Sequence, residues 1–270
     1  MTEANAAAEP HLLIEDRGHV RILTLNDPKT RNAFSKEMMV RVADAFRDSD
    51  ADPNVRVIVL TGAAGHFSSG SNLKEQIVRH ETEWQRRLDE DKEMWERAFL
   101  RRGRPKKPVV AAVEGYALAG GTEILQGTDI RVASRSAVFG VVEVTKGLFP
   151  LGGSTVRLAK QIPYTIALEM LLMGRTLSAE EALRYGLIGT VVDEGQALEK
   201  AVEIAQTIAE NGPLAVQAVL QAVRENFDLS EEDGLANELK IGFPRIYSAE
   251  AKEGRQAFIE KRKPNFTGVE

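Results

Sequence analysis

The sequence predicts an α/β body followed by a helical C-terminal region. Short apolar segments rich in β-branched residues alternate with segments of helical pattern in the first part of the chain, and this alternation is typical of α/β architecture. From about residue 151 onward the pattern becomes mostly helical. The composition shifts near residues 195–200, so we expect the body to end there.

Within the body, strands and helices are predicted from periodicity and from their end signals. A helix is expected from Ser35, a suitable N-cap with Glu37 in the first turn. A small-residue loop follows the second strand and runs to Asn72. A further helix is expected from about Gly120. The segments predicted to be strands are residues 20–25, 55–60, 108–113 and 130–133.

Residues 73–102 form a long, charged segment with a helical pattern. Four large apolar side chains recur near i, i+4 spacing and give one stripe: Trp84, Leu88, Trp95 and Phe99. The stripe predicts helix that packs on the core. Lining of a substrate tunnel is a second interpretation, and the two are compatible.

The C-terminal part is predicted to be consecutive helices. Ser178 and Glu181 form a capping-box pattern, which marks a helix start. Four further helices are expected over residues 196–211, 213–227, 230–247 and 248–262. The predicted organisation is a disordered N-terminus (1–10), an α/β body (11–198) and a helical C-terminal region (199–270).

Composition excludes several classes of protein. The chain has 270 residues, 43% of them apolar, which suffices for one sizeable core. The net charge is −5 with mixed signs, whereas nucleic-acid-binding proteins usually present a basic face. Without cysteine there is no disulfide, thiolate ligand or cysteine nucleophile, and the four histidines lack metal-ligand spacing. The first ten residues lack the features of a signal peptide, so we expect a cytoplasmic protein and no membrane association.

Two small-residue segments that follow strands are candidates for ligand contact. They are residues 62–73 and residues 115–123. Small residues let the backbone approach a ligand closely, and a helix start offers free N–H donors. Two such donors aimed at one point make an oxyanion hole. Neither segment has a Walker, Gly-x-Gly-x-x-Gly or Gly-x-Ser-x-Gly pattern.

Two glutamates lie in apolar surroundings near these segments. Glu123 is followed by Ile124 and Leu125, and Glu143 lies among valines. A single glutamate is usually a surface residue. Two in this setting are candidates for proton transfer, because an apolar environment raises a carboxyl pKa.

These segments resemble the two signatures of the crotonase superfamily, the enoyl-CoA hydratase/isomerase family. The first signature, Phe-x-Ala-Gly-x-Asp-Leu, corresponds to residues 67–73, and the second, Lys-Pro-x-x-Ala-x-x-x-Gly-x-x-x-Gly-Gly-Gly-x-x-Leu, begins at Lys107. The similarity extends from Val20 to residues 263–266. It implies a spiral of ββα units with a helical C-terminal region, and an assembly of trimers or paired trimers.

The resemblance also implies roles for individual residues. The oxyanion hole falls on the backbone N–H groups of Ser71 and Gly120, and the two hydratase glutamates fall on Glu123 and Glu143. The residues implied to bind coenzyme A are Lys29, Ser69, Phe258 and Lys261. No metal or separate cofactor is implied, since coenzyme A is part of the substrate. The basic run at residues 261–263 has the alternative interpretation of a solvated helix end.

The chain departs from the family pattern at several positions. Ser69 stands where alanine is usual, Asn72 where aspartate is usual, and Ala119 where the first glycine of the triplet is usual. Asn72 can still cap the following helix. Residues 141–142 replace a polar residue and proline before Glu143, which leaves the choice of acyl group open. His66 is a loop histidine with no assigned role.

The implied activity is addition of water across the 2,3 double bond of an enoyl-CoA thioester. A related isomerase, hydrolase or C–C lyase acting on a branched or cyclic acyl-CoA is the alternative within the family. A non-catalytic acyl-CoA-binding or RNA-binding scaffold is the alternative from another class. The presence of both glutamates and the acidic net charge disfavour this last interpretation.

Overall fold

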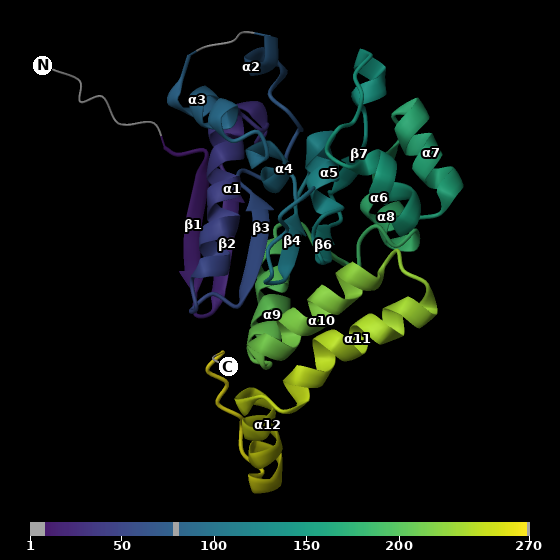
Figure 1. Cartoon of the computed structure of the whole chain (residues 1–270). Coiled ribbons are helices and arrows are strands. Elements are labelled where there is room, and N and C mark those ends of the chain that lie inside the picture. Colours follow the sequence, from purple (N-terminus) through teal and green to yellow (C-terminus); the bar gives the residue numbers. More distant parts are fainter. Residues whose placement is uncertain (1–8, 78–80, 269–270) are drawn as a thin grey trace, which may run out of the picture.

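The computed structural model describes residues 9–77 and 81–268 and contains two sheets wrapped by helices (Figure 1). The larger sheet has six strands, in the spatial order β1 (Leu12–Arg17), β2 (Val20–Leu25), β3 (Val57–Gly62), β4 (Val109–Val113), β6 (Ile130–Ser134) and β9 (Thr190–Val192). Only β1 is antiparallel to its neighbour. The smaller sheet contains β5 (Tyr116–Leu118), β7 (Val138–Gly140) and β8 (Thr176–Ser178). The mixed α/β architecture with C-terminal helices is confirmed.

Helices cover both faces of the large sheet. Helix α1 (Lys36–Ala51) packs on one face and α9 (Ala197–Ala209) on the other, and each contributes to its own apolar cluster. Every residue of β4 is buried, as expected for a strand covered on both sides. Further helices of the body are α5 (Gly120–Leu125), α6 (Ser154–Gln161), α7 (Tyr164–Met173), α8 (Ala179–Arg184) and the 3-10 helices η1 (Pro28–Thr30) and η2 (Glu143–Lys146).

Local end signals explain several elements. The Ser35 side chain accepts a hydrogen bond from the N–H of Met38 and so caps α1, as predicted. The predicted capping box is present at the start of α8, where Ser178 and Glu181 bond reciprocally.

Strand β1 was not predicted. It lies at the sheet edge with four of its six residues exposed, so it lacks an alternating apolar pattern.

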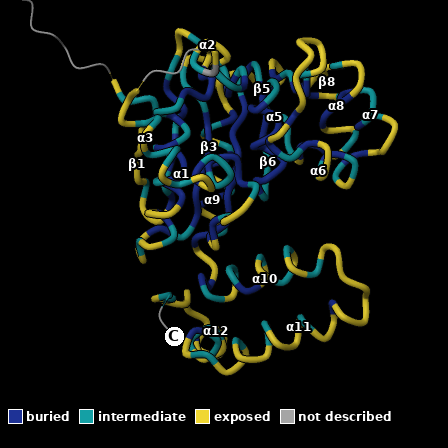
Figure 2. Tube along the Cα trace, turned by 45° about the horizontal axis from the view of Figure 1, so that its top comes forward, coloured by how far each residue is buried: buried dark blue, intermediate teal, exposed yellow. Residues whose placement is uncertain are grey.

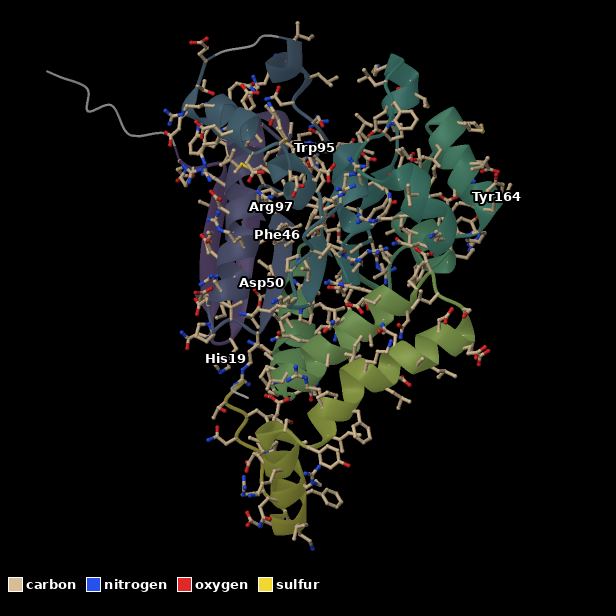
Figure 3. The ribbon with its side chains drawn as sticks, in the orientation of Figure 1. His19, Phe46, Asp50, Trp95, Arg97 and Tyr164 are labelled. Atoms are coloured by element: carbon tan, nitrogen blue, oxygen red, sulfur yellow. The ribbon has the colours of Figure 1, made fainter. Side chains whose placement is uncertain are left out.

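The single long helix suggested for residues 73–102 is wrong. The segment forms three short helices, α2 (Leu73–Ile77), α3 (Glu83–Glu90) and α4 (Met94–Ala98). Helix α3 ends at Asp91, which bonds Arg97 and starts a turn before α4. The aromatic stripe nevertheless packs on the core, as expected: Trp84, Leu88 and Trp95 are partly buried against it and Phe99 is buried. Figure 3 shows Trp95 pointing into the body.

Three helices after α9 form what we call the helical arm: α10 (Pro213–Asn226), α11 (Glu231–Ile246) and α12 (Ala249–Glu260). Helices α10 and α11 lie side by side below the body, and α12 follows at the lower end (Figures 1 and 2). The four predicted C-terminal helices are therefore present. Because α9 shares an apolar cluster with the large sheet, it belongs by packing to the body. The division of the chain at residue 198 stays a prediction.

No helix within the described residues is long and apolar enough to cross a membrane.

Candidate active site

Two backbone loops meet at the C-terminal edge of the large sheet. The loop after β3 pairs with β5, since Ser68 N–H donates to the carbonyl of Tyr116 (2.8 Å) and Leu118 N–H donates to that of Ser68 (2.9 Å). Only glycine fits at Gly70, which has φ +97° and whose added Cβ would lie 2.7 Å from Ala119 Cβ. This close approach brings the Ser71 and Gly120 peptides together.

The N–H groups of Ser71 and Gly120 have no hydrogen-bond acceptor among the described residues. Phe34 N–H donates to the Gly70 carbonyl and Asn72 N–H donates to the Phe34 carbonyl, so Ser71, between them, turns its own N–H to the other side. Gly120 is the first residue of α5, where N–H groups have no intrahelical partner. A Cβ added at Gly120 would lie 3.6 Å from Ser71 N. Two free donors therefore lie next to each other.

Ala119 precedes this donor with φ 50° and ψ −124°. That region favours glycine, so the alanine carries backbone strain that costs on the order of 1–3 kcal/mol. Two hydrogen bonds hold it there, from Ala119 N–H to the Gly140 carbonyl (2.7 Å) and from Glu123 N–H to the Ala119 carbonyl (3.0 Å). The departure from the family triplet thus leaves the conformation of the donor turn intact.

Glu123 lies on α5, one turn after Gly120, and is only 4% exposed. Its Oε1 accepts a hydrogen bond from the N–H of Ser154 (3.3 Å), the first residue of α6. Burial raises the pKa of Glu123, and hydrogen bonds from Ser154 and Gly152 oppose that rise. Gly152 has no room for a side chain, because an added Cβ would lie 2.6 Å from Glu123 Oε2.

Glu143 begins η2, directly after the short strand β7, and its carboxyl group meets that of Glu123. Its buried Oε2 has no hydrogen-bond partner among the described residues. Burial, and then the charge of Glu123, raise the pKa of Glu143 to about 7. The hydrogen bond between the two carboxyl groups lowers the pKa of Glu123 and raises that of Glu143. The arrangement therefore favours a protonated Glu143 beside an ionised Glu123.

The residues predicted to bind coenzyme A fall into two separate groups. Ser69 bonds the loop that carries Lys29, since its hydroxyl donates to the Thr30 carbonyl (2.7 Å). Phe258 and Lys261, in contrast, lie at the end of α12 and are exposed.

These two groups are at opposite ends of the chain's fold. The Lys29 loop follows the C-terminal end of β2, whereas His19, just before that strand, lies at the lower end of the large sheet, on the side where α12 lies (Figures 1 and 3). Arg56, just before β3, also donates to the Phe266 carbonyl (2.5 Å) and so ties the C-terminal tail to the N-terminal edge of the sheet. The fold of a single chain therefore does not bring the four residues together.

Other residues singled out from the sequence have structural places. Asn72 precedes α2, and its Oδ1 accepts from the N–H of Glu75 (3.4 Å), as expected of a cap. The His66 ring stacks on Tyr116 with centroids 4.9 Å apart. Phe99 packs against Gly120, whose added Cβ would lie 2.9 Å from the ring. The aromatic stripe thus reaches the donor loop at one end.

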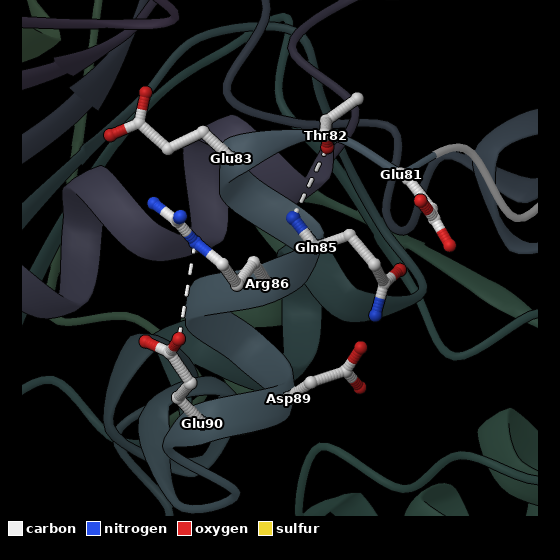
Figure 4. A pocket seen from close by; sticks show the side chains of 7 residues that line it. All are labelled: Glu81, Thr82, Glu83, Gln85, Arg86, Asp89 and Glu90. Atoms are coloured by element: carbon white, nitrogen blue, oxygen red, sulfur yellow. Dashed lines mark hydrogen bonds and ion pairs between the residues drawn. The ribbon is translucent and has the colours of Figure 1, made fainter.

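A surface pocket of about 620 Å³ lies on α3 (Figure 4). Its lining is entirely polar or charged and includes the ion pair of Arg86 and Glu90 (3.9 Å). Neither glutamate of the site nor either donor loop lines it. It has no part in the chemistry described above.

Comparison with known proteins identifies the family. Residues 15–269 match the family model described as enoyl-CoA hydratase/isomerase. The chain belongs to the enoyl-CoA hydratase/isomerase family. It is 48% identical to the enoyl-CoA hydratase EchA19 of Mycobacterium tuberculosis, with 97% of this chain and 98% of that protein covered. It is 33% identical to the 2,3-dehydroadipyl-CoA hydratase of Escherichia coli, with 95% and 98% covered.

Solved structures agree with this assignment. The crystal structure of the enoyl-CoA hydratase EchA1 from Mycobacterium marinum superposes with a TM-score of 0.89 at 41% identity, with 97% of this chain and 100% of that chain covered. The family membership and the fold inferred from the two signatures are confirmed.

Sequence reasoning missed three residues that surround Glu123. Gly152 and Ser154 lie at the start of α6, and the Gln126 side chain donates to the Ser154 hydroxyl (2.7 Å). The Gly152-Gly153 pair gave a signal for close backbone approach. Gln126 gave none, because nothing in its local sequence distinguishes it from a surface residue.

Proposed function

We propose that this protein is an enoyl-CoA hydratase that adds water across the 2,3 double bond of a 2-enoyl-CoA thioester. The observation that carries the proposal is the pair of buried, touching carboxyl groups of Glu123 and Glu143 beside two unpaired N–H donors. The family membership and the 48% identity to a hydratase support it.

In the proposed reaction the thioester carbonyl oxygen binds between the N–H groups of Ser71 and Gly120. Water attacks C3 while Glu123 takes one of its protons, and the resulting negative charge moves onto the thioester oxygen. The two donors stabilise that charge, and loss of one such donor typically costs about 3 kcal/mol. Glu143 then gives its proton to C2.

The hydrogen bond between the two carboxyl groups suits the return to the starting state. After addition, Glu123 holds the proton taken from water and Glu143 is ionised. Transfer of that proton from Glu123 to Glu143 restores the pair without a further group. A positioned acid or base of this kind contributes roughly 10²–10⁴ in rate.

We further propose that the active assembly is a homotrimer or a pair of trimers, acting in the cytoplasm. Large apolar side chains of the helical arm are exposed in one protomer, among them Leu239 (63%), Phe243 (55%) and Phe258 (85%). An exposed apolar face of this kind is typical of a subunit interface. Coenzyme A would then contact Lys29 and Ser69 of one protomer and Phe258 and Lys261 of a neighbour.

Complementation tests the shared coenzyme A site. Two inactive variants, Glu143→Gln and Lys261→Glu, are mixed under conditions that exchange subunits. Hydration activity should return, because a mixed assembly contains sites with an intact glutamate pair and a neighbour's intact Lys261. If a lack of recovery accompanies proven subunit exchange, the site does not use Lys261 from a neighbour.

A panel of acyl-CoA thioesters tests the activity itself. The protein is incubated with straight-chain, dicarboxylic, branched and aromatic 2-enoyl-CoA substrates, and products are identified by mass. Hydration adds one water, isomerisation leaves the mass unchanged, hydrolysis releases coenzyme A, and C–C cleavage gives two fragments. If no substrate gives a 3-hydroxyacyl-CoA and another product forms instead, the protein is not a hydratase, and that product identifies which alternative reaction it catalyses.

The glutamate assignment has its own variant test. Glu143→Gln should abolish hydration of crotonyl-CoA and leave thioester binding within a few-fold, because the amide keeps the shape but cannot donate the proton. Glu194→Gln, an exposed glutamate in a surface turn, is the matched control and should retain wild-type activity. Full activity in the Glu143 variant would remove Glu143 from the mechanism.

A further inference from the structure

Behind Glu123 lies a buried chain of two hydrogen-bonding side chains. Gln126 Nε2 donates to Ser154 Oγ (2.7 Å), and Ser154 in turn bonds the Glu123 carboxylate through its backbone N–H (3.3 Å) and its hydroxyl. The exposed fractions are 2% for Gln126, 0% for Ser154 and 4% for Glu123. Water therefore does not compete for these bonds.

The orientation of the Gln126 amide follows from its neighbours. Its nitrogen also faces the carbonyl of Thr122 (3.4 Å), which can only accept a hydrogen bond. Its oxygen, Oε1, has no partner among the described residues, and reversing the amide would place that oxygen against the Thr122 carbonyl, so that two acceptors would face each other. The Gln126 nitrogen is therefore the donor, and the Ser154 hydroxyl oxygen accepts its hydrogen bond.

This orientation decides where the Ser154 proton goes. Because Gln126 donates to the hydroxyl oxygen, the hydroxyl hydrogen is left for the Glu123 carboxylate. Hydrogen bonds to a carboxylate favour its charged form. Two other titratable groups face Glu123: the Glu143 carboxyl and, from α6, the Arg157 guanidinium. Burial raises the pKa of Glu123. The backbone N–H of Ser154 opposes that rise most, followed by the backbone N–H of Gly152 and then by the Ser154 hydroxyl.

We propose that Ser154 and Gln126 are positioning residues of the hydration reaction, which keep Glu123 ionised and aimed as the base that activates water. Ser154 acts directly on the carboxylate, and Gln126 acts through Ser154. The inference rests on the proposed function, because it assigns these roles within hydration. It explains how two adjacent glutamates take opposite protonation states: Glu123 has this hydrogen-bonded support, and Glu143 has an unpartnered buried oxygen.

The test is the pH dependence of kcat/KM with crotonyl-CoA. Ser154→Ala removes the hydroxyl but keeps the backbone N–H that starts α6. The pKa of Glu123 should rise, so the fall in kcat/KM on the acidic side should begin at a higher pH, by about half to one unit for one hydrogen bond. The loss of activity should thus be largest at low pH and should shrink as pH rises.

Companion variants separate positioning from structure. Ser154→Thr keeps a hydroxyl and should retain the wild-type profile. Gln126→Met, of similar length, should shift the profile in the same direction as Ser154→Ala but by less. Because Gln126 acts through Ser154, the double variant should shift no further than Ser154→Ala alone. Ser49→Ala removes another buried hydroxyl, far along α1, and should leave the profile unchanged.

Each failure points to a different conclusion. An equal loss of activity at every pH in Ser154→Ala, with no shift of the acidic side, overturns the proposal and leaves a packing role. Additive shifts in the double variant overturn the relay through Ser154. If Ser154→Ala does not fold, Gln126→Met alone decides by the presence or absence of its shift. A wild-type protein that hydrates no enoyl-CoA contradicts the proposed function instead.

Discussion

The α/β body and the helical arm place their apolar side chains in opposite ways. In the body, large side chains such as Phe67 and Phe139 are fully buried between sheets and helices. In the arm, Leu239 and Phe243 are more than half exposed (Figure 2). The arm is nevertheless attached to the body in a defined way, because Arg224 of α10 donates to the Asp129 carboxylate just before β6 (2.8 Å).

The contrast separates the tasks of the two regions. The body closes its own core and contains the glutamate pair with both donor loops, so the chemistry needs no contribution from the arm of the same protomer. The arm is ordered by hydrogen bonds and by burial of a few small residues, whereas its large apolar side chains stay exposed. We infer that its apolar face is completed by other copies of the chain.

The largest expected effect tests whether the chemistry resides in the body alone. Gly152→Ala should lower kcat for crotonyl-CoA by about 10²–10⁴-fold, because the new Cβ displaces the Glu123 carboxyl group. Gly242→Ala, in α11, meets nothing within 4 Å and is the matched control in the arm. Steady-state kinetics measure both. Comparable kcat values in the two variants would contradict the described packing of Glu123.

The next effect tests the self-contained core of the body. Phe67→Ala should lower the free energy of unfolding by about 3–5 kcal/mol, since it leaves a cavity in a close-packed interior. Chemical denaturation at several protein concentrations measures it, and the loss should be the same at each concentration. If the loss of unfolding free energy disappears at high protein concentration, the stability of the body depends on contacts between copies of the chain.

A smaller effect tests the arm as an interface. Leu239→Lys should weaken assembly by about 10- to 100-fold in dissociation constant, because a charge replaces an apolar contact. Sedimentation or light scattering as a function of concentration measures it. Glu238→Lys introduces the same cation at the neighbouring exposed position, without removing an apolar side chain. An unchanged assembly in Leu239→Lys would show that other copies do not cover this face.

The smallest effect concerns the cost of the buried acid. Because the folded pKa of Glu143 is raised to about 7 from 4.5, the folded state holds the proton more tightly between these values. Stability from this group is therefore fully present below about pH 4.5 and is lost as pH rises toward 7. Glu143→Gln should remove this dependence and raise Tm above pH 7. A scan of Tm against pH checks it, and equal slopes for both proteins would contradict the raised pKa.

Much of the fold could be predicted because its signals are local. Ser35 and the Ser178–Glu181 box mark helix starts within a few residues, and the apolar strands of the large sheet follow from their own composition. The prediction of one helix over residues 73–102 was wrong because apolar periodicity alone does not reveal where a helix is interrupted. The turn after Asp91 depends on its bond to Arg97 and on packing against α1.

The candidate site was predictable in its residues but not in its arrangement. The two signatures identified both glutamates and both donor loops from the order of residue types. They did not identify Ser154 and Gln126, whose roles depend on α5 and α6 meeting in space. Nor did they separate Lys29 from Phe258 and Lys261, which share one proposed ligand but lie at opposite ends of the sheet.

The sequence by itself determined the family, the α/β class and the helical ending, and it predicted roles for Glu123 and Glu143, because each rests on patterns a few residues long. Only the tertiary structure decided what these glutamates can do. Three separate segments, which carry Glu123, Glu143 and Ser154, pack into one contact. Burial, mutual charge and the hydrogen bonds of Ser154 then give the two carboxyl groups different proton affinities. Protonation is a property of that shared environment, which no single segment of the chain contains.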